Sequence, residues 1–597
     1  MKIALVAMPW PLFNRPSVQL GVLKGYLQRS WPELKVKNLH PYLKVAESLG
    51  FELYHQISAS SWLSEAMVAA FLFPEKKAEV IRLLNKLSRA EGLALDLDNL
   101  PSRCEAALEA YFESVPWSQF SAVGFSVCLN QLLASLWGAR WLKRRFPSLP
   151  IIFGGSQCAE DLGKSLLSLF PEIDFVINGE GEKPLRGLLE YLLKGAPLPE
   201  RGVFFRQGAE IKGGGVEQLP AEEIPSPAYE DYLAEVACLP AQKRFFPLIS
   251  LEASRGCWWF KCRFCNLNLQ WRGFRRKPLP QVLREVRAHA QAGLLDFAFM
   301  DNCLPVKDSL KLFSILAQDK ADYRFFAELR AVYRREDYHL LRQGGLTWVQ
   351  IGIEALSSSL LQRLGKGTSA IENLAAMRHC EEAGLQLEGN LILEFPGSTP
   401  DEVEETLAHL DFAFPFRPLT AVSFWLGYGS PVFKNPQAYG IKAVYPHPYY
   451  RQIFPESVAQ KLVPLVWSYR GDRTKQKRLW APVREKLRAW RKQYFKLRPQ
   501  EGPLLSFREG GQYLLIRQVL PTGQVLHHRL KGLSREIYLF LRDIRTFEEI
   551  QGRFPNLSAA QLTDFLEDLR KKRLLFREGA RFLALAIRPQ NNLAKGF

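Results

Sequence analysis

Short apolar runs and segments with helical periodicity alternate along the first 200 residues. Strand-like runs at residues 2–8, 122–127 and 150–156 are each followed by an amphipathic helical pattern. Strands that alternate with such helices predict a parallel sheet covered on both faces. We therefore expect a doubly wound, Rossmann-like α/β domain over residues 1–200, with a helix-rich insertion at residues 60–118.

A second α/β series follows a polar stretch rich in proline and glycine at residues 201–245, which is typical of a linker. Residues 246–440 contain six apolar runs, each separated from the next by a helical segment. This order predicts a partial or full (β/α) barrel, whose chemistry lies at the carboxyl ends of its strands.

The last part of the chain changes character twice. Residues 441–502 form a basic segment in which an amphipathic helix is predicted by apolar side chains at helical spacing, namely Leu479, Val483, Leu487, Trp490 and Tyr494. Residues 503–597 predict a hairpin, two helices and a final pair of strands, the second helix opening with a capping box from Ser558 to Gln561. That order suggests an α+β domain of the winged-helix type.

The net charge of +18 arises from 79 Lys and Arg residues against 61 Asp and Glu residues. Half of this excess lies within residues 470–502, which hold twelve basic and three acidic residues. A solvated helical face explains this segment most simply, although a nucleic acid or an acidic peptide would also suit it. The first residues lack the pattern of a secretory signal, and no run reaches eighteen apolar residues, so we expect a cytoplasmic protein without a membrane span.

Three of the nine cysteines, Cys257, Cys262 and Cys265, lie within nine residues just after the first expected barrel strand. Thiolates hold iron–sulfur clusters, and three of them leave one iron of a [4Fe–4S] cluster open to a small chelating ligand. Zinc is the alternative, but it prefers four ligands, and no further Cys or His follows at a suitable spacing. The other six cysteines are scattered and predict structural roles.

The cysteine motif resembles that of the radical S-adenosylmethionine (SAM) superfamily, with C-x₄-C-x₂-C in place of the usual C-x₃-C-x₂-C. The string GCWWFKCRFCNLN looks most similar to the peptide-maturation C-methyltransferases of that superfamily, with Asn266 where that group has glycine. The resemblance implies that SAM contacts come from polar residues and a glycine at the ends of the next strands: Asp301, Asn302, Glu328, Arg330, Gly352 and Glu354.

The first domain resembles the cobalamin-binding domains fused to many radical SAM enzymes. This resemblance implies a cobalamin site along the strand ends, formed by Pro9, Ser17, Ser126, Ser135, Gly154, Gly155, Gly179 and Glu180. His40 stands in the string NLHPYL, which lacks the Asp and Gly of the cobalt-ligating D-x-H-x-x-G motif, so a structural role is favoured for it. The alternative is a nucleotide-binding or structural domain, although no G-x-G-x-x-G follows the first strand.

Together these resemblances imply a radical SAM C-methyltransferase in which the cluster cleaves SAM, a 5′-deoxyadenosyl radical abstracts hydrogen, and methylcobalamin donates a methyl group to carbon. A peptide or natural product is the expected substrate, and flavodoxin or ferredoxin the expected electron donor. The alternatives are a cobalamin-independent radical SAM enzyme, methylation of an aromatic sp² carbon without the adenosyl radical, and a cluster- or cobalamin-based sensor that binds nucleic acid. The sequence marks no general base; Tyr428 is the one candidate, and packing is the favoured interpretation of it.

Overall fold

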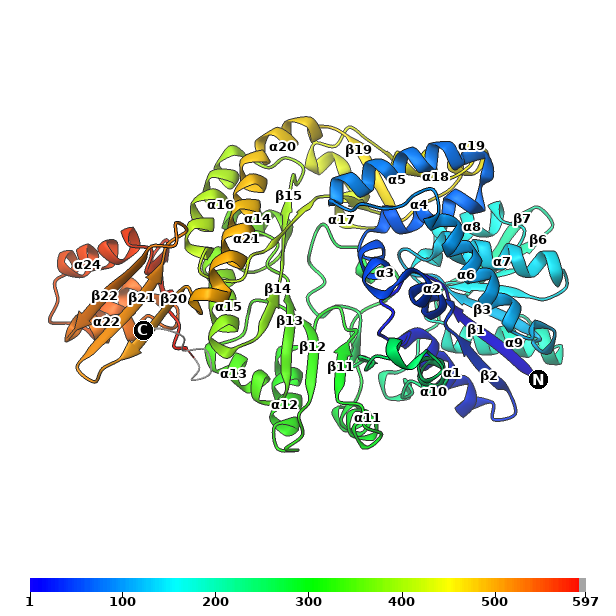
Figure 1. Ribbon diagram of the computed structural model, residues 1–597, viewed down its shortest axis with the longest axis horizontal. Coiled ribbons are helices and arrows are strands. Elements are labelled where there is room, and N and C mark those ends of the chain that lie inside the picture. The colour runs from blue at the N-terminus through cyan, green and yellow to red at the C-terminus, as the bar shows by residue number, and fades with distance from the viewer. Residues whose placement is uncertain (590–597) are drawn as a thin grey trace.

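The computed structural model describes residues 1–589 and begins with a seven-stranded sheet (Figure 1). Its strand order is β2-β1-β3-β4-β5-β6-β7, with β1 to β5 parallel. The order reverses between β1 and β3, which is the position where open α/β sheets bind ligands. The strands are β1 Lys2–Ala7, β2 Lys35–Leu39, β3 Ala122–Ser126, β4 Ile151–Gly154, β5 Phe175–Ile177, β6 Val203–Gln207 and β7 Glu210–Gly214.

Helices cover both faces of this sheet, as the alternating pattern predicts. The main covering helices are α1 Val18–Ser30, α7 Leu132–Arg145, α8 Asp161–Leu169 and α9 Glu182–Lys194. The helix-rich insertion is confirmed and consists of α4 Ser61–Leu72, α5 Lys77–Glu91 and α6 Leu100–Ser114. The sheet, however, continues past residue 200, because the hairpin β6–β7 pairs antiparallel with β5 inside the stretch expected to be a linker.

The second unit is a partial barrel at the centre of the molecule (Figure 1). Five parallel strands run in the order β14-β13-β12-β11-β8, and β15 and β16 continue the wall through a bridge between Glu354 and Leu391. The six expected strand segments are thus confirmed. The strands are β8 Ile249–Leu251, β11 Asp296–Phe299, β12 Arg324–Leu329, β13 Leu346–Ile351, β14 Gln386–Glu388, β15 Asn390–Leu393 and β16 Thr420–Ser423.

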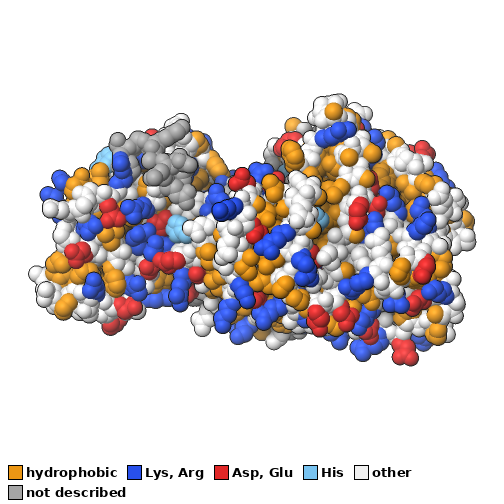
Figure 2. All heavy atoms as spheres, turned by 90° about the horizontal axis from the view of Figure 1, so that it is seen from below, with side chains coloured by type: hydrophobic (Ala, Val, Ile, Leu, Met, Phe, Trp, Pro, Cys, Tyr) orange, Lys and Arg blue, Asp and Glu red, His pale blue; other side chains and the backbone are white. Residues whose placement is uncertain are grey.

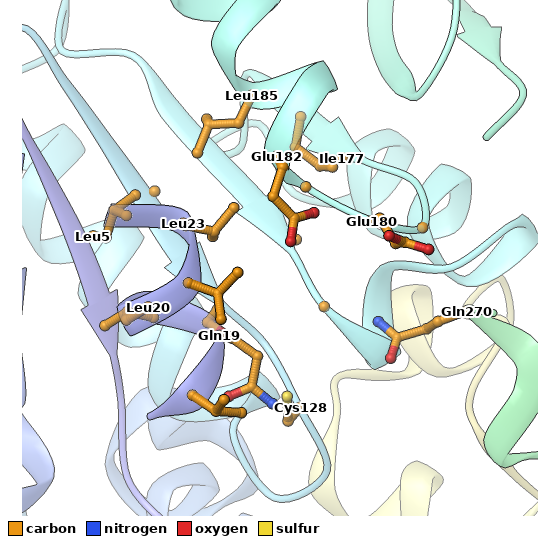
Figure 3. A pocket seen from close by; sticks show the side chains of 18 of the residues that line it. Leu5, Gln19, Leu20, Leu23, Cys128, Ile177, Glu180, Glu182, Leu185 and Gln270 are labelled. Atoms are coloured by element: carbon orange, nitrogen blue, oxygen red, sulfur yellow. The ribbon is translucent and has the colours of Figure 1, made fainter. Parts of the chain in front are cut away.

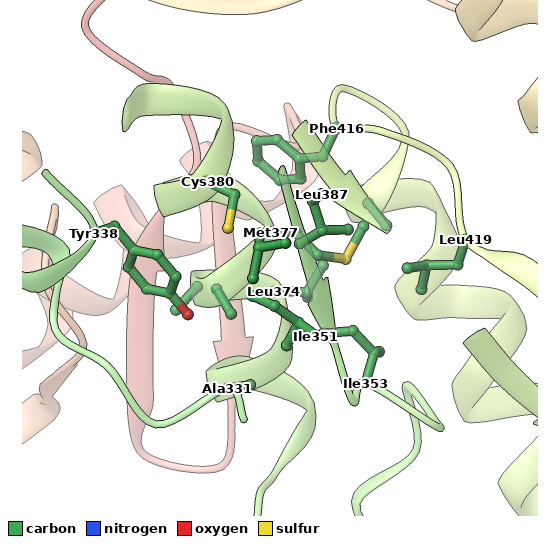
Figure 4. Close-up of a cluster of buried hydrophobic side chains, with 14 of the residues drawn as sticks. Ala331, Tyr338, Ile351, Ile353, Leu374, Met377, Cys380, Leu387, Phe416 and Leu419 are labelled. Carbon is green, nitrogen blue, oxygen red and sulfur yellow. The ribbon is translucent and has the colours of Figure 1, made fainter. Parts of the chain in front are cut away.

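The barrel wall is held by apolar side chains packed between strands and outer helices (Figure 4). Ile351 and Ile353 on β13 and just after it, and Leu387 on β14, meet Leu374 and Met377 of α15 Ala370–Ala383, all fully or nearly fully buried. Burying each such side chain contributes about 1.5–3 kcal/mol. This packing holds β13 and β14 in place, and the loops that follow the barrel strands start from this rigid wall.

Residues 441–502 are less helical than expected. A three-stranded antiparallel sheet, β17-β19-β18, precedes the basic helix, with β17 Leu426–Gly427, β18 Ala443–Pro446 and β19 Val466–Arg470. The amphipathic helix itself is confirmed as α21 Ala481–Glu501, which buries Val483, Leu487, Trp490 and Tyr494. Leu479 falls on the separate helix α20 Arg473–Leu479.

The C-terminal unit lies at the far end of the molecule from the first domain (Figure 1). A sheet of β20 Leu505–Glu509, β21 Tyr513–Val519 and β22 Val525–Lys531 precedes a helix-strand-helix-helix-strand-strand order, which is that of a winged helix. The expected capping box from Ser558 to Gln561 is present at the start of α24 Ala559–Lys571. The expected domain extends to residue 597, and its residues 590–597 lie outside the described part.

Among the helices of residues 1–589, none is both long and apolar enough to cross a membrane. The basic excess does not gather into one patch on the face seen in Figure 2, where Lys and Arg side chains alternate with Asp and Glu. Net charge alone therefore does not identify a binding face.

Candidate active site

The loop that carries the three cysteines leaves the barrel at the carboxyl end of β8. Its two ends are held together because β9 Ser254–Arg255 pairs antiparallel with β10 Arg275–Arg276. Gly256 begins the loop with φ +80°, and a Cβ there would lie 2.3 Å from the carbonyl oxygen of Gly273. Only glycine fits this close approach.

All nine cysteines lie in the described part of the chain, and none forms a disulfide. Cys257, Cys262 and Cys265 are half-buried, and burial raises the pKa of Cys262 and raises that of Cys265 to about 12. Within residues 1–589, no three His, Cys, Asp or Glu side chains converge closely enough to hold one metal ion. A four-iron cluster binds each cysteine through a different iron, so its thiolates need not converge on one point. The three thiols therefore fit a cluster better than a zinc ion.

Two buried cations face the cysteine loop. The guanidinium carbon of Arg330 lies 4.0 Å from the centre of the Trp259 ring, and its Nη2 donates to the carbonyl of Lys366. Lys366 Nζ lies 3.1 Å from Glu354 Oε1. Although burial lowers the pKa of Lys366, the attraction of Glu354 and then Cys262 outweighs it and raises the pKa. The site thus keeps positive charge beside the thiols.

The glycine that follows β13 lies against a buried ion pair. A Cβ at Gly352 would lie 2.2 Å from Lys366 Nζ and 3.0 Å from Glu354 Oε1. The space is therefore filled by the ion pair of this chain. The expected contact of Gly352 with SAM stays a prediction.

Three carboxylates stand close together at the ends of β11, β12 and β13. Burial is the largest cause that raises the pKa of Glu328 to about 7, and the charges of Glu354 and Asp301 raise it further. Arg15, from the loop after β1, opposes this rise and lies 5.2 Å over the Phe326 ring. Near neutral pH, Glu328 can therefore both donate and accept hydrogen bonds.

Several buried donors here lack a partner within the described residues. They are Asn302 Nδ2, Arg15 Nε and Arg330 Nε. A buried donor without an acceptor costs about 1–3 kcal/mol, so a bound molecule that offers acceptors would be stabilised. Together with the neighbouring carboxylates, which could accept from an ammonium group, these donors fit the carboxylate and amino ends of SAM.

Asp301 ties the cysteine loop to β11, since its carboxylate accepts from the Ala253 N–H at 3.0 Å and the Ser254 hydroxyl at 2.5 Å. Burial raises its pKa from 3.8 to about 7. Between these values the unfolded chain is ionised and the folded chain is protonated, so stability falls as pH rises from about 4 to 7. We therefore expect the free energy of unfolding of Asp301→Asn, relative to that of wild type, to rise by about 2 kcal/mol between pH 5 and pH 8.

Thermal unfolding at both pH values checks this expectation. The Tm difference between Asp301→Asn and wild type should move in favour of the variant toward pH 8, whereas the exposed Asp322→Asn should show no such trend. A difference that is equal at the two pH values would show that Asp301 is already ionised at pH 5.

A cavity lies at the carboxyl ends of β1, β3, β4 and β5, at the reversal of strand order. Leu5, Leu20 and Leu23 form an apolar side, and Glu180 and Gln270 approach from the opposite side (Figure 3). Gln270 belongs to the cysteine loop. The cavity is therefore walled by both the first domain and the barrel.

The structure brings together five of the eight residues expected at a cobalamin site. Those lining the cavity are Ser126, Gly154, Gly155, Gly179 and Glu180. Ser135 is fully buried within α7 and donates to the carbonyl of Gln131 at 2.6 Å, so it faces the helix interior. Ser17 caps α1 through the N–H of Leu20, and Pro9 is buried within the loop after β1. These three do not line the cavity.

A buried ion cluster joins the two domains at the cavity wall. Arg255 donates to Glu180 at 2.7 Å, to Glu182 at 2.6 Å and to Glu252 at 2.9 Å. The side chains of Arg255, Glu180 and Glu182 are each 4% exposed or less. Because its carboxylates come from both domains, this cluster orients the barrel against the first sheet.

Two weaker candidates lie outside the cavity. The hydroxyl of Tyr428 donates to Asp161 at 2.9 Å, which links the barrel to α8 of the first domain. His40 is 2% exposed, and its Nδ1 lies 3.0 Å from Glu235 of α10 Glu230–Ala237. Both side chains hold structural elements together.

Arg15, Lys366 and Arg255 are site residues that sequence reasoning missed. Arg15 is a single arginine in a loop, and its approach to the barrel depends on the packing of two domains. Lys366, in the string GKGT, lies fourteen positions after Gly352 in the sequence, and no motif links the two.

Residues 251–410 match the family model of the Radical SAM superfamily. This part of the chain is a radical SAM domain, and such a domain implies a [4Fe–4S] cluster and SAM as cofactors. The overall fold is that of cobalamin-dependent radical SAM enzymes, as the following similarities show. The expected resemblance is thus confirmed for the domain and for the fold.

Two solved structures share this architecture. The cobalamin-dependent SAM radical enzyme OxsB, with aqua-cobalamin and SAM bound, is 17% identical with a TM-score of 0.56, over 83% of this chain and 67% of OxsB. The radical SAM methyltransferase TsrM from Kitasatospora setae, with tryptophan and a SAM analogue bound, is 16% identical with a TM-score of 0.55, over 82% of this chain and 88% of TsrM.

Curated relatives match a smaller part. An uncharacterized methyltransferase of Pyrococcus horikoshii is 28% identical over 251 residues, which cover 40% of this chain and 52% of that protein. The hopanoid C-3 methylase of Methylococcus capsulatus is 27% identical over 280 residues, 43% of this chain and 49% of the methylase. The chain therefore spans about half the length of these two relatives.

Proposed function

We propose that this protein is a cobalamin-dependent radical SAM methyltransferase that transfers a methyl group from SAM, by way of cobalamin, to a carbon atom of a peptide or natural product. The observation that carries the proposal is the cavity at the reversal of strand order, because the cysteine loop itself supplies Gln270 and Trp271 to its wall. A cofactor in that cavity would lie directly beside the cluster loop. The names of the methyltransferase relatives agree with this function.

Each cofactor has a set of residues to hold it. Cys257, Cys262 and Cys265 would bind the cluster, while Arg330 and Asn302 would bind SAM. The cavity residues Ser126, Gly154, Gly155 and Gly179 would hold the nucleotide tail of cobalamin. When bound, the cluster with SAM supplies radical chemistry at an unactivated carbon, and cobalamin supplies the methyl group.

The residues of the chain orient these groups and exclude water. Arg330 stacks on Trp259, whose indole N–H donates to the carbonyl of Gly365 at 2.9 Å, so the cation is fixed beside the loop. Gly367 leaves room for that indole, since a Cβ there would lie 2.1 Å from it. A rigid, dry wall of this kind limits side reactions of a radical.

The C-terminal unit supports a peptide substrate. Within the described residues, no strand pairs with the outer edge of β22, and His527, Arg529 and Lys531 are exposed in alternation along it. An extended peptide could add to this edge as a further strand, with acidic side chains toward the cations. Since the unit lies on the side of the barrel opposite the first domain (Figure 1), such a peptide would dock at a distance from its methylated residue.

Filling the cavity should remove cobalamin without affecting the cluster. In protein reconstituted anaerobically with iron, sulfide and cobalamin, we expect Ser126→Phe to lose most of the bound cobalamin, because the larger side chain occupies the space at the end of β3. Iron content and the cluster absorption should match wild type. Both cofactors are quantified by absorbance and by iron and cobalt analysis.

Ser135→Ala is the matched control, since Ser135 lies in the same domain but faces the interior of α7. It should retain cobalamin as wild type does. Retention of cobalamin by Ser126→Phe with an intact cluster would show that cobalamin binds elsewhere or that the cavity serves another ligand.

A further inference from the structure

The turn formed by residues 364–368 packs directly against the cysteine loop. The carbonyl of Leu364 accepts from the Arg263 N–H at 2.9 Å, and the next carbonyl of the turn accepts from the Trp259 indole N–H at 2.9 Å. These two hydrogen bonds fall on either side of Cys262 in the loop. We call residues 364–368 the lysine turn, which thus has one fixed position against a cluster ligand.

Three glycines make room for Lys366 in the middle of the lysine turn. Gly365 and Gly367 have φ values of +68° and +69°, a conformation that favours glycine. A Cβ at Gly365 would lie 2.4 Å from a carbonyl oxygen of the cysteine loop, and one at Gly367 would lie 2.1 Å from the Trp259 ring. At the tip of the lysine side chain, Gly352 leaves the space that Nζ occupies. The local sequence therefore fixes the place of this ammonium group.

The ammonium group of Lys366 is buried and has donors to spare. The residue is 6% exposed, and within residues 1–589 its Nζ has one hydrogen-bond acceptor, Glu354 Oε1 at 3.1 Å. An ammonium group carries three donors, and burying its charge is costly unless it is fully partnered. Burial raises the pKa of both Cys262 and Cys265, and the charge of Lys366 opposes that rise at each. The spare donors thus lie within electrostatic reach of two cluster ligands.

We propose that Lys366 is a positioning residue that raises the reduction potential of the [4Fe–4S] cluster, because its ammonium group stabilises the negative charge that reduction adds. Reduction places one further electron on a cluster that its thiolates already make negative, so a cation beside it favours the reduced form. Net charge and hydrogen bonds to sulfur set the potential of such clusters. The inference goes beyond the proposed function, since it concerns the cluster and needs neither cobalamin nor the substrate.

The two neighbours of Lys366 do not replace it in this role. Arg330 stacks on Trp259 and donates to the carbonyl of Lys366, so its guanidinium holds the lysine turn in place. Glu354 carries the opposite charge and limits the effect of the lysine. A lysine that served only to neutralise Glu354 would not need a turn anchored to the cysteine loop on both sides of Cys262.

A redox titration tests the proposal on the full-length, reconstituted protein without added SAM. Dithionite and mediators set the potential, and electron paramagnetic resonance measures the reduced cluster. We expect Lys366→Met to lower the equilibrium constant for reduction about tenfold or more, which is about 59 mV for a one-electron couple. A unit charge in a poorly screened interior acts strongly over several ångströms. Lys366→Arg keeps the charge and should remain closer to wild type than to Lys366→Met.

Glu354→Gln provides the decisive comparison, because it removes the opposite charge from the same ion pair. It should raise the midpoint potential, whereas Lys366→Met lowers it. Lys261→Met is the matched control, since Lys261 precedes Cys262 in the loop but is exposed, and solvent screens its charge. Its equilibrium constant for reduction should stay within about twofold of wild type.

A wild-type potential in Lys366→Met would overturn the proposal. Shifts of the same sign in Lys366→Met and Glu354→Gln would do so as well, because they would indicate a disturbed loop rather than an effect of charge. If Lys366→Met binds no cluster, Glu354→Gln decides alone, and an unchanged or lower potential there would contradict the proposal. Absence of methyl transfer with the expected shifts intact would refute the proposed function and leave the role of Lys366 standing.

Discussion

Replacing Cys262 with alanine is expected to abolish both the [4Fe–4S] cluster and the cleavage of SAM. Two thiolates cannot fix a four-iron cluster whose remaining iron must stay open, and Cys262 is the central ligand of the loop. Iron and sulfide content after anaerobic reconstitution, together with the absorption and the electron paramagnetic resonance of the reduced protein, measure the first effect. Production of 5′-deoxyadenosine measures the second.

Cys303→Ala provides a demanding control. Cys303 is buried next to the loop, and its pKa is raised mainly by burial and next by the nearby Cys257. If three thiolates hold the cluster, Cys303→Ala should keep both cluster and SAM cleavage. Loss of the cluster in Cys303→Ala would make Cys303 a fourth ligand and would close the iron position that SAM needs. A normal cluster in Cys262→Ala would refute the assignment of the loop.

Replacing Arg255 with leucine is expected to have the largest effect on stability. The substitution leaves the carboxylates of Glu182 and Glu252 buried without their cation and leaves Glu180 with Arg275 alone, which costs about 3–5 kcal/mol. Because these residues come from two domains, the first unfolding transition in calorimetry should fall by several degrees. Cobalamin retention should fall as well, since Arg255 and Glu180 line the cavity.

Arg276→Leu is the matched control for that result. It breaks the ion pair of Arg276 with Asp308 at 3.0 Å, whose side chains are 65% and 39% exposed, so the expected change is within about 1 kcal/mol. Adding Glu182→Gln to Arg255→Leu should recover part of the lost stability, because it removes one unpaired charge. An Arg255→Leu protein as stable as Arg276→Leu would show that water or a rearrangement compensates the buried carboxylates.

Local periodicity was sufficient to predict the two α/β units, the helical insertion and α21. The β6–β7 hairpin was missed because Gly213, Gly214 and Gly215, all with positive φ, look like a linker in the sequence although they form part of a sheet edge and its exit. The sheet of β17, β18 and β19 was missed because its strands are two to five residues long and separated by irregular chain. Such pairing depends on contacts that no local pattern reveals.

The candidate site was predictable where one short motif carries the chemistry, and less so where distant residues meet. The three cysteines were recognisable from their spacing, whereas the place of Lys366 against Gly352 and of Arg15 against Glu328 depends on tertiary packing. Ser135 is a residue that was predicted for the site but does not line the cavity. A serine near a helix start resembles a ligand-binding residue, but its hydroxyl donates to a carbonyl within its own helix. Small residues at strand ends predicted the lining of the cavity correctly only where the strand end itself borders the cavity.

The products formed from SAM by the reduced, reconstituted wild-type protein test the central claim most directly. The protein should retain cobalamin and the cluster together and, with substrate, release S-adenosylhomocysteine and 5′-deoxyadenosine while one methyl group from labelled SAM appears on a carbon of the product. Protein that forms the cluster and 5′-deoxyadenosine but binds no cobalamin and transfers no label would contradict the account.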